Sequence, residues 1–130
     1  MRRSARELAL QALFQREFTT NIPFPQFLGL FEEKFANEVL AYAQTLVEGV
    51  AAHRDSLDQI IGQSSRHWKV DRIALVEKNI LRIALFEMKF SSQPVKPSIV
   101  IDEAIEIGKK YGSTEAGSFI NGILDHAAKS

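Results

Sequence analysis

Three arginines at the start of the chain are the residues whose types and spacing best suit binding chemistry. Arg2, Arg3 and Arg6 open the stretch "RRSARELALQALFQREF". On a helix Arg6 lies one turn from both others, so the three guanidinium groups are predicted to converge beside the first turn. A helix start carries partial positive charge and repels cations. The cluster therefore indicates an anion site whose counter-ion, such as a phosphate backbone, comes from outside the chain, the alternative being a frayed, solvated terminus.

Three residues on the predicted helices are further candidates for outside contacts. Phe119 lies about 80° from the buried stripe of the last helix, beside Gly122, so its ring is a candidate for stacking on a nucleobase, with a core position as the alternative. Glu77 falls within the apolar stripe of the central helix, where an unpaired carboxylate is costly to bury. Its partner is either an arginine of this chain or a donor on another protein. Phe86, on the opposite polar side, is a weaker candidate for an exposed contact.

Residues for catalysis or metal binding are few. The chain has no cysteine, which excludes disulfides and thiolate chemistry, and its three histidines have no partner at ligand spacing. Gly117 and Gly122 lack the following lysine that a phosphate loop needs. Asp102, Glu103 and Glu106 are spaced as a solvated helix face. The sequence therefore predicts a non-catalytic binding protein without a metal or a cofactor.

Composition places this chain among ordinary globular proteins. Its 130 residues, 45% hydrophobic and 25% charged, suit one compact domain, and no run of roughly 20 apolar residues predicts a membrane span. The absence of cysteine fits a reducing compartment, so we expect a cytoplasmic protein. The formal net charge is zero, but residues 1–16 carry +3 and residues 17–64 carry −5. Any binding to nucleic acid must therefore be local.

Apolar residues recur at three- and four-residue spacing along nearly the whole chain, which predicts an all-helical fold of six to seven helices. The expected helices cover about 3–18, 25–34, 37–62, 71–90, 97–110 and 115–128. Asn37 and Asp71 are the predicted N-caps of the third and the central helix. We expect one domain of two small helical bundles, about 1–64 and 66–130, that share the buried central helix.

Three blocks of sequence together resemble one family. They are "RRSARELALQALF" at 2–14, "VEKNILRIALFEM" at 76–88 and "VIDEAIEIGKKYGSTEAGSFINGILD" at 100–125. In their order and spacing they resemble the NusB family of bacterial transcription antitermination factors. The resemblance implies an all-helical, non-catalytic protein that pairs with the small-subunit ribosomal protein NusE. Together the two would bind the single-stranded boxA element of nascent ribosomal RNA and so act indirectly on the RNA polymerase elongation complex.

The resemblance also implies roles for individual residues. The positions matching RNA contacts of the family are Arg2, Arg3, Arg6 and Phe119. The positions matching the NusE-facing surface or its junction are Phe14, Glu77 and Glu115. Phe14 stands where the family often has tyrosine, so any hydrogen bond from that hydroxyl is absent here.

Two rival interpretations belong to other classes. NusB-like helical domains also precede the catalytic domain of certain ribosomal RNA cytosine methyltransferases. This chain ends at Ser130 without a glycine-rich cofactor loop or a catalytic cysteine, so the enzyme interpretation requires it to be a fragment. The second rival is a structural helical homodimer that associates through Phe86, Phe14 or Glu77 and never meets RNA.

Overall fold

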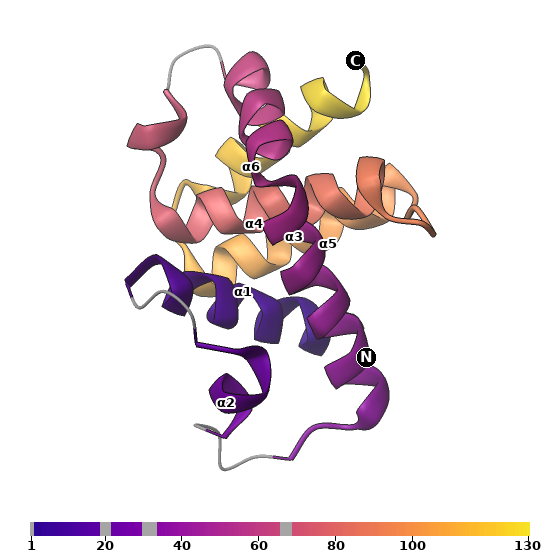
Figure 1. Ribbon diagram of the computed structural model, residues 1–130. Coiled ribbons are helices and arrows are strands. Elements are labelled where there is room, and N and C mark those ends of the chain that lie inside the picture. Colours follow the sequence, from indigo (N-terminus) through magenta and orange to yellow (C-terminus); the bar gives the residue numbers. More distant parts are fainter. Residues whose placement is uncertain (1, 19–21, 30–33, 66–68) are drawn as a thin grey trace.

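The computed structural model describes residues 2–18, 22–29, 34–65 and 69–130, and within these ranges the protein is all-helical, as predicted. The α-helices are α1 (Arg2–Phe18), α2 (Phe24–Leu28), α3 (Asn37–Ser64), α4 (Leu75–Leu85), α5 (Pro97–Tyr111) and α6 (Ala116–Ala128) (Figure 1). A short 3-10 turn, η1 (Val70–Arg72), precedes α4, and a π-helical segment, η2 (Phe86–Phe90), continues it. None of these described helices is long and apolar enough to cross a membrane.

The sequence predicts a buried central helix, and the structure encloses α4 on all sides, its polar side included. Every residue from Glu77 to Leu85 is buried. Helices α1, α3, α5 and α6 all pack against it, and Figure 1 shows α4 running between α1 and α6 with α3 crossing in front. The buried apolar residues of all these helices form one continuous core. This arrangement fixes the positions of both ends of α1 relative to α4, α5 and α6.

Both predicted N-caps are wrong. Asn37 is the first residue of α3, and the cap position belongs to Ala36, which makes no side-chain cap. Asp71 lies in η1, and extended backbone at Ile73 separates that turn from α4, whose cap is Ala74. Burial of the Ile73 side chain accounts for this break, because it turns the chain inward before α4 begins. The predicted helix over 25–34 is shorter, Phe24–Leu28, and residues 30–33 lie outside the described ranges.

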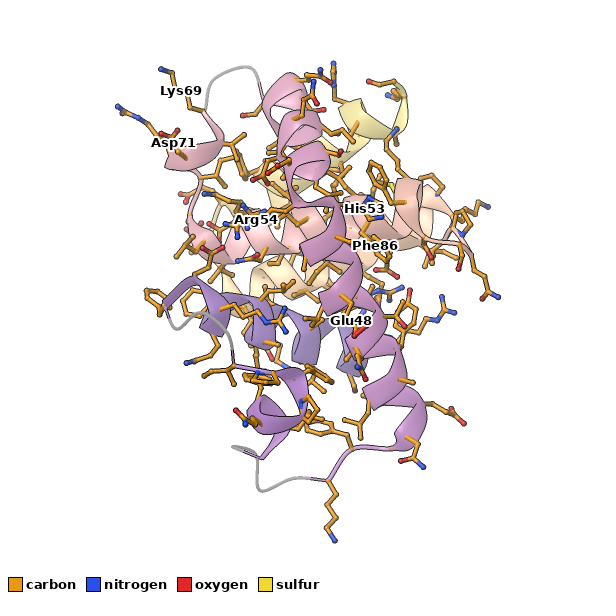
Figure 2. The ribbon with its side chains drawn as sticks, in the orientation of Figure 1. Glu48, His53, Arg54, Lys69, Asp71 and Phe86 are labelled. Carbon is orange, nitrogen blue, oxygen red and sulfur yellow. The ribbon has the colours of Figure 1, made fainter. Side chains whose placement is uncertain are left out.

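The prediction that Phe86 makes an exposed contact is also wrong. Phe86 is 6% exposed, and its ring occupies the space left by the missing side chain of Gly49 on α3. Figure 2 shows Phe86 beside His53, and the two ring centroids are 6.0 Å apart. His53 has non-helical backbone angles that kink α3 here, and its ring stacks on Phe90 at 4.7 Å. The polar side of α4 is therefore covered by α3 instead of solvent.

Candidate nucleic-acid interface

The first turn of α1 holds the three arginines, and Arg6 is the one that points inward. Its side chain is only 5% exposed, and it donates two hydrogen bonds to Glu87, from Nε to Oε1 at 2.7 Å and from Nη2 to Oε2 at 2.9 Å. Burial acts to lower the pKa of Arg6, but the hydrogen bonds and negative charge of Glu87 hold that pKa above its ordinary value. Arg6 is thus a buried cation with a buried counter-ion.

Arg3 lies nearer the surface and is paired with α5. Its side chain is 49% exposed, and Nε donates to Glu103 Oε1 at 3.2 Å. Arg6 Nη1 reaches the same carboxylate oxygen at 3.3 Å. The hydrogen bond from Arg3 is the largest cause of a lowered pKa at Glu103. The expectation that Arg3 and Arg6 take their counter-ion from outside the chain is therefore wrong, since Glu87 and Glu103 neutralise the unfavourable helix start from within.

Arg2 differs from the other two arginines. It is exposed and makes no hydrogen bond or ion pair with any described residue, and its guanidinium carbon lies 4.4 Å from the ring centroid of Tyr42 on α3. The three guanidinium groups therefore do not converge. Arg6 enters the core, Arg3 turns to α5, and Arg2 rests on an aromatic ring of α3. The cationic edge, which we define as Arg2 and Arg3, is what solvent meets at this end of α1.

Tyr42 links this edge to the core, because its hydroxyl hydrogen-bonds to Glu87. Burial first, and then the hydrogen bond and charge of Glu87, raise the pKa of Tyr42 from 10.0 to about 12. Glu87 thus accepts hydrogen bonds from both Arg6 and Tyr42.

The raised pKa predicts how stability changes at high pH. The folded state favours the neutral phenol, so this contribution is fully present below pH 10.0 and is lost as pH rises through about 12. We expect Tyr42→Phe to be less stable than wild type at pH 8 and the difference to shrink above pH 10. Urea unfolding of both proteins from pH 8 to 11.5 measures this. Tyr111→Phe controls for a second tyrosine whose pKa is raised by burial; a constant difference between wild type and Tyr42→Phe would contradict the prediction.

The other predicted contact residues meet at the opposite end of α1. Glu77, Glu115 and Phe119 line one groove of about 420 Å³, together with Arg72 and Ser113, and we call this the Glu77 groove. Phe119 is half-buried at its rim. A side chain added at the neighbouring Gly122 would meet no atom within 4 Å, so the space beside the ring is open.

Glu77 itself is 8% exposed, yet its carboxylate makes no hydrogen bond or ion pair with any residue that the structure describes. One carboxylate oxygen lies where a side chain at Gly112 would stand, so glycine is required there for the carboxylate to fit. The sequence left open whether an arginine of this chain neutralises Glu77, and among the described residues none does. A donor from another molecule can reach it through the groove.

Phe14 lines a second groove of about 420 Å³ on the other side of the start of α4, with Phe27, Val76 and Tyr111. Since Val76 precedes Glu77, the two grooves flank one turn of helix. Phe14 also contacts Phe18, which is 68% exposed, with ring centroids 5.1 Å apart. At 1.5 Å per residue, Phe14 lies roughly 16 Å along α1 from Arg3. The structure thus groups Phe119 with Phe14, Glu77 and Glu115 and separates it from the arginines.

Sequence reasoning missed Glu87, Tyr42 and Arg72. A carboxylate in an apolar helix needs a partner, and this holds for Glu87 as well as for Glu77. Glu87 could therefore have been identified from the sequence as a residue with a partner. Tyr42 follows the helical spacing of core residues, so nothing in the sequence distinguishes it. Arg72 lies in a turn that the sequence does not predict.

The fold and these surfaces define a small all-helical binding domain, with a cationic edge and two grooves at opposite ends of its first helix. Residues 3–129 match the model of the NusB family, and the chain belongs to that family, as the resemblance predicts. Its relatives are named for transcription antitermination, so the expectation of a non-enzymatic family is confirmed.

Individual relatives match over nearly their whole length. The transcription antitermination protein NusB of Bdellovibrio bacteriovorus is 51% identical over 128 residues, which covers 98% of this chain and 95% of the relative. That of Anaeromyxobacter dehalogenans is 45% identical over 130 residues, covering 98% and 89%. Among solved structures, NusB of T. maritima aligns with a TM-score of 0.88 at 32% identity, covering 100% of this chain and 92% of that one. A crystal structure of antitermination factors NusB and NusE in complex with dsRNA aligns with a TM-score of 0.82 at 30% identity, covering 98% and 96%.

Proposed function

We propose that this chain is a cytoplasmic antitermination factor that binds boxA-type single-stranded RNA of ribosomal RNA transcripts together with NusE. It acts on the RNA polymerase elongation complex through that RNA. The family and the structural likeness to a NusB bound to NusE and RNA support the proposal. The observation that carries it is the separation of the cationic edge from the two grooves, one of which holds a carboxylate that has no partner among the described residues, because two ligands can then bind at once.

The cationic edge is the RNA-binding part of the proposal. Arg2 has no hydrogen bond or ion pair among the residues that the structure describes, and Arg3 shares its charge with a partly exposed Glu103, so both can turn guanidinium donors to phosphate oxygens. Arg6 contributes by pairing with the buried Glu87 and the partly exposed Glu103, since its own burial prevents direct phosphate contact. Two contacts on a neutral protein give weak binding alone, and a partner on the same strand raises the affinity through linked binding.

The two grooves are the NusE-binding part. A basic side chain of the partner that enters the Glu77 groove supplies the donor that Glu77 does not find in the described part of the chain, and Glu115 at the exposed side adds negative charge. Phe14 and the exposed Phe18 offer an apolar surface beside it. Phe119, at the rim of the Glu77 groove, stacks an RNA base where RNA and partner meet.

Titration of labelled boxA RNA, single- and double-stranded, with NusE present and absent tests this function. For two phosphate contacts we expect log K against log salt concentration to have a slope of about −1.4 on single strands, rather than about −2 for three. Arg2→Ala and Arg3→Ala should each weaken binding and reduce the slope by about 0.7. Glu77→Gln should weaken NusE binding and leave binding to RNA alone unchanged.

Matched controls come from exposed charges elsewhere. Arg54→Ala removes a cation on α3 whose side chain is 55% exposed, and Asp102→Asn removes an exposed carboxylate on α5. Both should behave as wild type.

RNA binding with a salt slope indistinguishable from zero would refute the cationic edge. RNA binding that is unchanged in the double variant Arg2→Ala, Arg3→Ala would refute it as well. Persistent dimers without RNA binding in sedimentation would favour the structural homodimer.

A further inference from the structure

We propose that Arg2 and Tyr42 form a subsite for a single nucleobase, in which the base stacks on the outer face of the Arg2 guanidinium while Tyr42 supports the inner face. This inference rests on the proposed RNA binding and specifies how one residue of the cationic edge is used. Tyr42 is a positioning residue in this arrangement, and Arg2 touches the RNA.

The ring of Tyr42 is held firmly. Its hydroxyl is bound to Glu87, which is 1% exposed and is itself fixed by two hydrogen bonds from Arg6. The ring therefore has a defined position before any ligand arrives, and little conformational entropy is lost there on binding. Tyr42 differs in this respect from an aromatic side chain standing free in solvent.

Arg2 is positioned by that ring instead of by a carboxylate. Its guanidinium carbon lies 4.4 Å from the ring centroid, a distance typical of cation–π contact, and it has no hydrogen bond or ion pair within the described part of the chain. One side of the group thus faces Tyr42, and the exposed side remains available. Nucleobases of single-stranded RNA stack on arginine planes as well as on aromatic rings.

The surroundings provide room for a base. Arg2 and Tyr42 line a hollow of about 380 Å³ between the start of α1 and α3, where Ala5 and Ala41 contribute only small side chains. Glu38 also lines this hollow, and its carboxylate repels a phosphate but accepts a hydrogen bond from a base amino group. The base should therefore enter the hollow while its phosphate stays outside, where the in-plane N–H groups of the stacked Arg2 guanidinium can still donate to it. The same carboxylate disfavours an acidic peptide as the ligand.

The test separates stacking from charge. Arg2→Lys keeps the charge and loses the plane, and Tyr42→Leu keeps Arg2 and loses its support. We expect each to bind single-stranded boxA RNA about three- to tenfold more weakly with an unchanged salt slope, since stacking and cation–π contacts are of this size. Tyr42→Phe lacks the same hydroxyl as Tyr42→Leu but restores the ring, so it should recover most of the affinity. Arg54→Ala is again the control.

An RNA series with one abasic nucleotide at each position locates the subsite. At one position the abasic nucleotide should weaken RNA binding by wild type three- to tenfold. At the same position it should leave RNA binding by Arg2→Lys and Tyr42→Leu unchanged. Wild-type affinity in both variants, or losses at no particular position, would overturn the subsite even if Arg2→Ala weakens binding; failure of wild type to bind RNA would instead refute the proposed function and the subsite with it. Should Tyr42→Leu unfold in thermal melts, Arg2→Lys decides. Binding of a glutamate-rich peptide that depends on Tyr42, with RNA binding that does not, would overturn the inference in favour of a protein ligand.

Discussion

Replacing Glu87 with alanine is expected to lower the free energy of unfolding by about 3–5 kcal/mol, because the substitution leaves a buried guanidinium without its counter-ion. Glu87 is 1% exposed, and Arg6 beside it is 4% exposed, so water cannot substitute for the lost carboxylate. The hydroxyl of Tyr42 loses its partner as well. Because domains of this kind are stable by only about 5–15 kcal/mol, urea unfolding should show a greatly shifted midpoint.

A double variant distinguishes a buried ion pair from a generally intolerant position. Arg6→Met combined with Glu87→Leu removes both charges and keeps apolar volume, so it should lower the free energy of unfolding by less than Glu87→Ala or Arg6→Ala does alone. Glu106→Gln is the surface control. Its ion pair with Lys109 is largely exposed, and a change of under about 0.5 kcal/mol is expected. A loss of stability in the double variant equal to the sum of the losses in its two single variants would contradict a shared buried pair.

Phe86→Ala is expected to cost about 3–5 kcal/mol, since it empties a buried aromatic site where α3 crosses the end of α4. Gly49→Ala should lower the free energy of unfolding by about 1–3 kcal/mol, because the added methyl group overlaps the Phe86 ring. This substitution overpacks the same contact that Phe86→Ala empties. Thermal and urea unfolding of both variants measure these effects.

Coupling between the two positions is the sharper test. In a Phe86→Leu background the ring that blocks position 49 is gone, so Gly49→Ala should cost less there than in wild type. Gly122→Ala is the matched control, a helical glycine with open space around it, and it should stabilise by up to about 1 kcal/mol through helix propensity. If Gly49→Ala were as benign as Gly122→Ala, the proposed contact would be wrong.

Hydrophobic spacing predicts the long helices well but not what covers their polar sides. The side of α4 that carries Arg82 looks solvent-facing in sequence, yet Arg82 is 3% exposed. It is buried because Asp58 on α3 accepts from its Nε at 2.7 Å and Glu17 on α1 accepts from its Nη1 at 3.0 Å. Such pairs join residues far apart in sequence, and no local pattern contains them. The burial of Phe86 escapes prediction for the same reason, because the space for its ring comes from Gly49 on α3.

In the candidate site, too, the sequence predicts the local features but not the contacts between distant residues. The sequence identifies Arg2, Arg3 and Arg6 as unusual at a helix start, which is a local electrostatic fact. It does not reveal that Glu87 and Glu103, 81 and 97 residues beyond Arg6, supply internal counter-ions. The grouping of Phe119 with Glu77 likewise depends on how α6 packs against the start of α4.

Helix α1 is unbroken from Arg2 to Phe18, and this has a mechanical consequence. Each residue of a helix adds about 1.5 Å and 100°, so its two ends keep a constant spacing and a constant rotation about the axis. If RNA holds one end and a protein partner the other, α1 acts as a ruler that sets the register between them. One alanine inserted in its middle would swing one end by about 100° relative to the other and put the two ligands out of phase.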